Sequence, residues 1–122
     1  MTAHSENEEA FFRLGRLYNE RGRVRKSLES FKKVIEINPR YAEAYNNLGS
    51  IYSSMGDGEE GIEQFKKAVD INPRYGAAHN NLAAAYYNRG ELQMAEGHCK
   101  KAVELGYDVP DELLRLLEAH KR

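Results

Sequence analysis

The chain contains few of the residues that mark disulfide-linked, membrane-spanning or cofactor-dependent proteins. Among its 122 residues there are one cysteine, no tryptophan and three prolines. A single cysteine excludes an internal disulfide, and no apolar run approaches the ~20 residues of a membrane-spanning helix. The N-terminus also lacks the basic start and apolar stretch of a signal peptide. Together these absences predict a cytoplasmic protein that does not insert into membranes.

Charge of either sign is abundant, but neither sign is in excess. Charged residues make up 30% of the chain, yet the formal net charge is only −1. Without a net basic field, the composition gives no reason to expect nucleic acid as a partner. A chain of this length can bury a continuous core as one domain.

What the sequence does contain is an internal repeat of 34 residues. The segment Asn-Pro-Arg-Tyr at residues 38–41 recurs at residues 72–75, and Phe-Lys-Lys at residues 31–33 recurs at residues 65–67. A period of this length is typical of stacked helix-turn-helix units, none of which can bury its apolar face alone. We therefore expect three units, which occupy residues 8–41, 42–75 and 76–109.

Glycine marks the joint within each unit. The two helices of a unit would meet at Gly22, Gly56 and Gly90. The turn that ends a helix often needs a left-handed backbone, which glycine adopts without strain. Ser5 and Asp57 each have a glutamate three residues later, the spacing of a capping box at a helix start. We therefore expect residues 1–5 to be a disordered N-terminus and residues 6–122 to form a single domain.

Apolar and small residues also recur at the repeat spacing. One apolar slot of the first helices holds Leu14, Leu48 and Leu82. The small residues are Gly15, Gly49 and Ala83 on the first helices, and Ser27, Gly61 and Ala95 on the second. Small side chains at these positions allow two helix backbones to cross closely.

In these slots the chain resembles the tetratricopeptide repeat (TPR) family over about nine-tenths of its length. The family pattern places an aromatic residue, leucine-glycine and tyrosine on the first helix, and a small residue, an aromatic, alanine and proline on the second. Unit three departs from it, because Tyr107 replaces the terminal proline and Glu96 takes the slot of Leu28 and Ile62. A last repeat that faces solvent is expected to vary in this way. The resemblance implies an all-α fold, a right-handed superhelical α-solenoid of three helix-turn-helix repeats.

A seventh helix is expected to cap this stack at residues 110–121. Pro110 near its first turn and the two acidic residues that follow favour a helix start. The apolar stripe that would cover the open end of unit three consists of Leu113, Leu116 and Leu117. Leu114 lies outside that stripe, so a contact between two copies of the chain is the alternative role of this helix.

No group of residues has the arrangement of a catalytic or metal site. Cys99 follows His98, but adjacent helical residues point about 100° apart and do not face each other. Cys99 also takes the core slot of Phe31 and Phe65, where cysteine packs as a small apolar residue. His79 takes an aromatic packing slot, and His98 is expected on a solvated helix face. We predict no enzyme activity, no metal and no cofactor.

Three lysine pairs recur at the repeat spacing. They are Lys32 and Lys33, Lys66 and Lys67, and Lys100 and Lys101. Stacked units would align them in a basic row, which raises the alternative of phosphate or membrane-surface binding. Acidic residues three or four positions away favour instead solvated helix faces held by ion pairs.

The resemblance implies that the first helices line a concave groove in which an extended peptide or a partner's helix binds. The slots that line it here hold Phe12, Arg13, Arg16, Asn46, Asn47, Ser50, Asn80, Asn81, Tyr87 and Asn88. The sequence around Asn47 is similar to repeats of O-linked N-acetylglucosamine transferases, where an asparagine ladder holds the target's main chain. An amide suits this role because it offers two donors and an acceptor. The alternative is that Asn47 and its equivalent Asn81 brace neighbouring helices.

The charged residues of the groove also indicate the chemistry of its partner. Arg13 and Arg16 make one end cationic, so an acidic residue of the partner is expected there, held by charge-assisted hydrogen bonds. Chaperone-binding members of the family clamp a terminal carboxylate, but of the matching slots here only Asn47 fits, which argues against a heat-shock chaperone. Two functions remain. The first is a protein-protein interaction module, or adaptor, that binds a peptide in the groove, and the second is a self-associating scaffold that assembles through groove or terminal-helix contacts.

Overall fold

The computed structural model describes the backbone of residues 2–121 and the side chains of residues 7–121. Within that range the chain is all-α, which confirms the predicted fold class. The helices are α1 (Thr2–Glu20), α2 (Val24–Ile37), α3 (Ala42–Ser54), α4 (Gly58–Ile71), α5 (Gly76–Asn88), α6 (Leu92–Glu104) and α7 (Asp111–Ala119). None of these helices is long and apolar enough to cross a bilayer.

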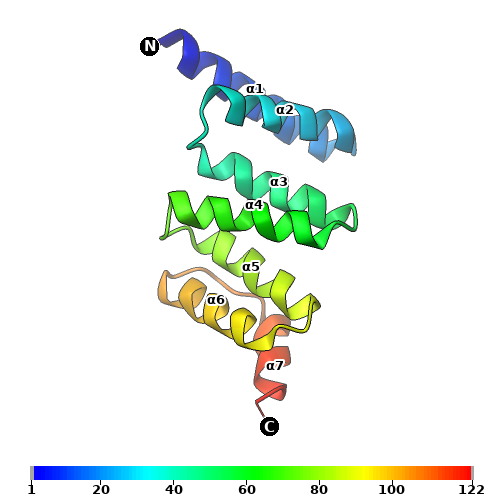
Figure 1. Cartoon of the computed structure of the whole chain (residues 1–122), viewed down its shortest axis with the longest axis vertical. Coiled ribbons are helices and arrows are strands. Elements are labelled where there is room, and N and C mark those ends of the chain that lie inside the picture. The colour runs from blue at the N-terminus through cyan, green and yellow to red at the C-terminus, as the bar shows by residue number, and fades with distance from the viewer. Residues whose placement is uncertain (1, 122) are drawn as a thin grey trace.

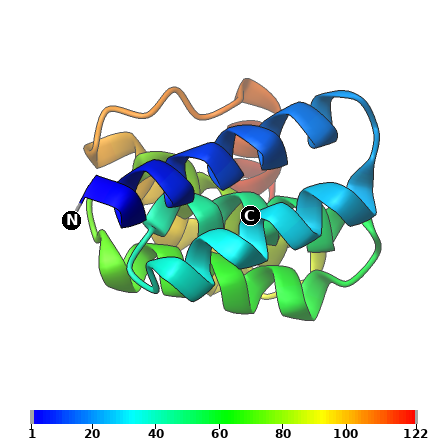
Figure 2. The ribbon, with the colours of Figure 1, turned by 90° about the horizontal axis from the view of Figure 1, so that it is seen from above.

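The helices pair and stack in chain order. Figure 1 shows α1 at one end of the long axis and α7 at the other. The closest packing joins the two helices of each unit, and the second helix of a unit then packs against the first helix of the next. Viewed along the stack in Figure 2, α1 lies on one side and α2 and α4 lie on the other. In this view the second helices α2 and α4 thus share one face, opposite α1.

The recurring Asn-Pro-Arg-Tyr segment is the turn between units. In the first copy, the Asn38 carbonyl accepts a hydrogen bond from the Tyr41 N–H at 3.2 Å, and the Asn38 side-chain oxygen accepts one from the Arg40 N–H at 3.1 Å. The second copy, at residues 72–75, makes the same two bonds at 3.1 and 3.2 Å. Asparagine is suited to this position because its side chain can bond to the backbone two residues on. The sequence repeat is thus a repeated turn geometry.

The helix ends follow the sequence signals except at the N-terminus. The three joint glycines adopt positive φ angles of 75°, 89° and 79°, and the Asp57 carboxylate caps α4 by accepting from the Glu60 N–H at 3.2 Å. Helix α1, however, begins at Thr2, before the capping pattern at Ser5, and the expected disorder of residues 1–5 stays a prediction. No glycine or proline interrupts this segment, so nothing in it ends the helix. Met1 lies outside the described residues.

The helices of a unit cross at the small residues. The Ser27 hydroxyl donates to the Gly15 carbonyl at 2.6 Å, which ties α2 to α1. A Cβ atom on Gly15 would lie 2.8 Å from the Phe31 ring, and one on Gly49 would lie 2.5 Å from the Phe65 ring. Glycine is therefore required by packing at these two positions, not by backbone conformation.

Candidate functional site

The predicted groove residues of unit one differ in their exposure and in the contacts that they already make. Phe12 is half-buried: its ring stacks on Tyr41 with centroids 5.1 Å apart and meets the edge of Phe31 at 5.5 Å. Arg13 is exposed but forms an ion pair with Glu9 at 3.3 Å. Arg16 is exposed and has no ion pair among the described residues. Arg16 is thus the cation of this end that is best placed to bind an anionic group.

The asparagines of units two and three form specific contacts. The Asn81 amide nitrogen donates to the Asn46 side-chain oxygen at 2.9 Å, which joins α5 to α3. The Asn47 amide nitrogen donates to the Glu43 carbonyl, one turn earlier in α3, at 2.9 Å. Asn81 therefore braces two neighbouring helices, while Asn47 bonds only within its own helix. Asn47 retains its acceptor oxygen and one N–H for another partner, and Ser50 beside it is exposed.

Three predicted residues of unit three meet α7 around one hollow. The hollow has a volume of about 290 Å³ and is lined by Asn80, Ala84, Tyr87, Asn88, Pro110, Glu112, Leu113 and Leu116. The Tyr87 hydroxyl lies 3.3 Å from His120 Nε2 just beyond α7. The side-chain oxygen of Asn80 is buried and has no hydrogen-bond partner in the described chain. The hollow therefore combines an apolar wall from α7 with polar groups from α5.

Helix α7 packs differently from the sequence prediction. Leu113 and Leu117 are buried, as expected, but Leu116 is 36% exposed and so resembles Leu114 at 39%. Its assignment to the buried stripe is corrected: residues 113 and 117 are one turn apart and face the core, whereas residue 116 lies to one side, at the hollow. The sequence did not indicate that α7 forms a hollow with the predicted groove residues of α5, because this helix has no counterpart in the repeat.

Comparison with known proteins identifies the family. The tetratricopeptide repeat family model matches residues 40–109, which is more than half of the chain, and a TPR repeat model matches residues 15–56. The chain belongs to the tetratricopeptide repeat family. No curated protein matches it.

Several solved structures share this TPR fold. MamA is 30% identical with a TM-score of 0.78, over 82% of this chain and 58% of the MamA chain. The first TPR of Spaghetti (RPAP3), bound to the HSP90 peptide SRMEEVD, is 19% identical with a TM-score of 0.88, over 97% of this chain and 96% of that one. The Sgt2 TPR domain from Aspergillus fumigatus is 23% identical with a TM-score of 0.82, over 94% and 77%. In general terms the TPR chain is thus a protein-interaction module.

The third TPR unit contains a histidine pair packed between α5 and α6. The His79 Nε2 lies 2.9 Å from the Pro73 carbonyl, which can only accept, so this nitrogen carries the proton. The His79 Nδ1 lies 3.1 Å from the His98 Nδ1, and the His98 ring stacks on Tyr86 with centroids 5.7 Å apart. The prediction of a solvated His98 is therefore wrong, since the ring is half-buried between two aromatic neighbours.

This burial makes the stability of the TPR chain sensitive to acid. Burial first, and the neighbouring His79 second, lower the pKa of His98 below its usual value. Below pH ~6.5 the unfolded chain protonates His98 while the folded chain does not. The free energy of unfolding should therefore fall as the pH drops from neutrality, and this loss should end below the folded pKa of His98.

The measurement is urea denaturation across this pH range for the wild-type chain and for His98→Gln. Glutamine is the natural choice because unit two has Gln64 in the same slot. The His98→Gln chain should lose less stability on acidification, and His120→Gln, at an exposed position, should behave like wild type. An unchanged pH dependence in His98→Gln would contradict this account.

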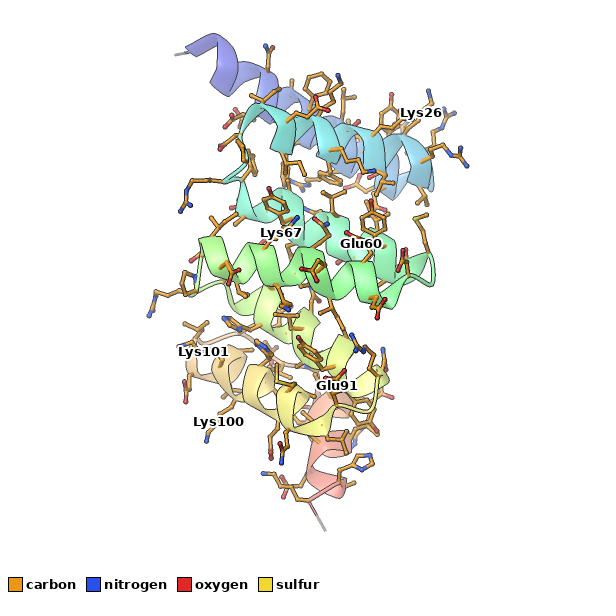
Figure 3. The ribbon with its side chains drawn as sticks, viewed as in Figure 1. Lys26, Glu60, Lys67, Glu91, Lys100 and Lys101 are labelled. Carbon is orange, nitrogen blue, oxygen red and sulfur yellow. The ribbon has the colours of Figure 1, made fainter. Side chains whose placement is uncertain are left out.

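The remaining chemical candidates lie outside the groove. Cys99 is buried, as predicted, and burial, followed by the charge of Glu96, raises the pKa of its thiol. Within residues 7–121 no three His, Cys, Asp or Glu side chains cluster as metal ligands. Of the ion pairs predicted for the lysine pairs, the described side chains form only Lys33–Glu36, at 3.9 Å. Lys67 instead lies over the Tyr45 ring at 5.8 Å (Figure 3).

Proposed function

We propose that this TPR chain binds an extended peptide, or a segment of a partner protein, along the surface of the first helices α1, α3 and α5. The proposal rests mainly on the hollow between α5 and α7, because it joins polar groups of α5 to an apolar wall from α7. A TPR of the same fold, that of Spaghetti (RPAP3), is bound to a peptide. The chaperone peptide itself is not proposed as the partner, since only Asn47 matches the clamp.

The described contacts suggest how such a segment would be held. An extended main chain presents N–H and C=O groups that the remaining donor and acceptor of Asn47 can bond. Arg16 would bind an acidic side chain through charge-assisted hydrogen bonds. At the other end, the hollow is large enough for one bulky apolar side chain against Leu113 and Leu116. A rotation of the Asn80 amide, whose terminal torsion is soft, would turn its unpaired oxygen toward the ligand.

The test starts from peptides selected on the immobilised chain from a random-sequence library. Their affinity is then measured by titration calorimetry for wild type and for the combined variant Arg16→Ala, Asn47→Ala and Ser50→Ala. We expect the variant to bind at least about tenfold more weakly, since loss of one hydrogen bond to a charged group costs about 1.5–3 kcal/mol. Asn81 is left unchanged because its amide bonds to Asn46.

The matched control replaces exposed residues of the second helices, Lys66→Ala with Lys100→Ala. This control should retain wild-type affinity. If the first-helix variant also retained it, the groove assignment would be wrong. The absence of catalysis and the cytoplasmic location remain predictions from the sequence.

Self-association is the second function, and one observation favours it. Large apolar side chains are exposed at both ends of the stack, among them Leu17 in α1 and Leu114 in α7. Exposed apolar surface at defined places is typical of protein contacts.

A further inference from the structure

Helix α1 carries an apolar stripe that the structure leaves uncovered. Ala10, Leu14 and Leu17 follow the spacing of one helix face, and the two leucines are 39% and 49% exposed. In α3 the same slots hold Ala44, Leu48 and Ile51, which are 0%, 1% and 3% exposed. The same kind of stripe is therefore buried in unit two and exposed to solvent in unit one.

The difference has a plain structural cause. In unit two, the stripe packs in one cluster with Phe31 and Val34 of α2, the second helix of the preceding unit. Among the described residues no helix precedes α1 in the stack (Figure 1). The α1 stripe thus has the composition of a surface that another helical element covers.

The opposite end of the stack is apolar as well. A hollow of about 500 Å³ lies between α6 and α7, and its apolar lining includes Val103, Leu114 and Leu117. Six of the eight exposed large apolar residues in the described chain lie at the two ends: Leu14, Leu17, Val103, Tyr107, Leu114 and Leu116. The apolar surface that the fold leaves exposed is therefore concentrated where one copy could meet another.

Each end includes one segment with a local excess of charge, and the two excesses are of opposite sign. Residues 13–26, around the end of α1 and the start of α2, contain six basic residues and one acidic residue. Residues 104–121, around α7, contain five acidic and two basic residues. None of the four basic residues from Arg21 to Lys26 forms an ion pair within the described chain. Opposite fields of this kind select the partner and its orientation.

We propose that copies of the chain associate head to tail, with the α1 stripe of one copy against the α6–α7 end of the next. This proposal rests on the self-association function and not on peptide binding in the groove. Leu14 and Leu17 would pack against Val103 and Leu114. Because two different surfaces meet, the contact leaves one free surface at each end and can continue to longer assemblies.

Two single-end variants test this geometry by sedimentation velocity. The wild-type chain should increase in mass with concentration, from monomer to species larger than a dimer. Leu17→Glu and Leu114→Glu should each remain monomeric, because every contact needs one intact end of each kind. Mixed in equal amounts, they should form a heterodimer and nothing larger, since one intact surface of each kind remains. Met55→Glu, an equally exposed position away from both ends, should assemble like wild type.

The outcomes separate the orientation from self-association itself. If the wild-type chain stays monomeric into the millimolar range, both self-association and the head-to-tail orientation are overturned. Binding of an added acidic amphipathic peptide at Leu17 would not rescue either of them. Self-association that Leu17→Glu abolishes but Leu114→Glu preserves would assign a contact between two α1 stripes, which overturns the head-to-tail arrangement alone. Added salt should weaken the association because the two ends attract by charge, and an unchanged or stronger association at high salt would contradict the charge assignment.

Discussion

Replacing Leu48 by alanine is expected to lower the free energy of unfolding by about 2–5 kcal/mol, whereas the same change at Leu14 should cost less than about 1 kcal/mol. The two leucines hold the same slot one repeat apart. Leu48 is enclosed by α2 and lies in one cluster with Phe31 and Val34. Its truncation would leave a cavity that the packed helices cannot close, while water already reaches Leu14.

The measurement is equilibrium unfolding in urea, at a concentration where the chain is monomeric. Leu82→Ala serves as a second buried reference, because Leu82 is fully buried in the same slot of unit three. It should resemble Leu48→Ala in size. Equal losses at Leu14 and Leu48 in the monomer would contradict the exposed α1 stripe.

Gly49→Ala is the second substitution with a large expected effect on stability. It should lower the free energy of unfolding, whereas the same change in most helices raises it. Alanine in place of glycine within a helix ordinarily adds up to about 1 kcal/mol of stability. Here the new Cβ would lie 2.5 Å from the Phe65 ring and 3.0 Å from the Gly61 carbonyl oxygen. Overpacking of this kind costs about 1–3 kcal/mol, so a net loss of stability is expected. Gly58→Ala is the control, since no atom lies within 4 Å of its added Cβ.

Unit three contains the compensating change. Ala83 stands in the slot of Gly49, and the facing slot holds Cys99 where unit two has Phe65. The loss caused by Gly49→Ala should therefore shrink when Phe65→Cys is also present, with a coupling energy of about 0.5–3 kcal/mol in a double-mutant cycle. The Gly61 carbonyl remains close, so the rescue should be partial. Strictly additive changes in stability would show that the Phe65 ring is not the reason why position 49 requires glycine.

The fold was predictable because the same signals recur in register. The same helix boundaries are indicated in successive units by the turn at residues 38–41, the joint glycines and the apolar slots. The N-terminal start was wrong for a local reason: Ser5 with Glu8 satisfies a capping pattern, yet nothing in residues 2–4 prevents the helix from continuing. A short capping pattern alone does not fix the residue at which a helix begins.

The candidate site was less predictable because it depends on how the units sit against each other. Residue identity could not decide between a free Asn81 and one that bonds to Asn46, since the answer depends on the rotation between successive units. Helix α7 had no earlier repeat to serve as a guide, so its contact with Tyr87 gave no sequence signal. His98 was misjudged because its slot is polar in every unit, yet Ser30 and Gln64 in that slot are also buried.

A nuclear magnetic resonance titration would locate the peptide on the stack. An isotopically labelled chain would be titrated with one selected peptide, and amide shifts would be mapped on the stack. We expect a continuous set of shifted amides on the first helices, from Arg16 through Asn47 and Ser50 to Asn88. Shifts confined to the second helices α2, α4 and α6, with none on α1, α3 and α5, would contradict this expectation.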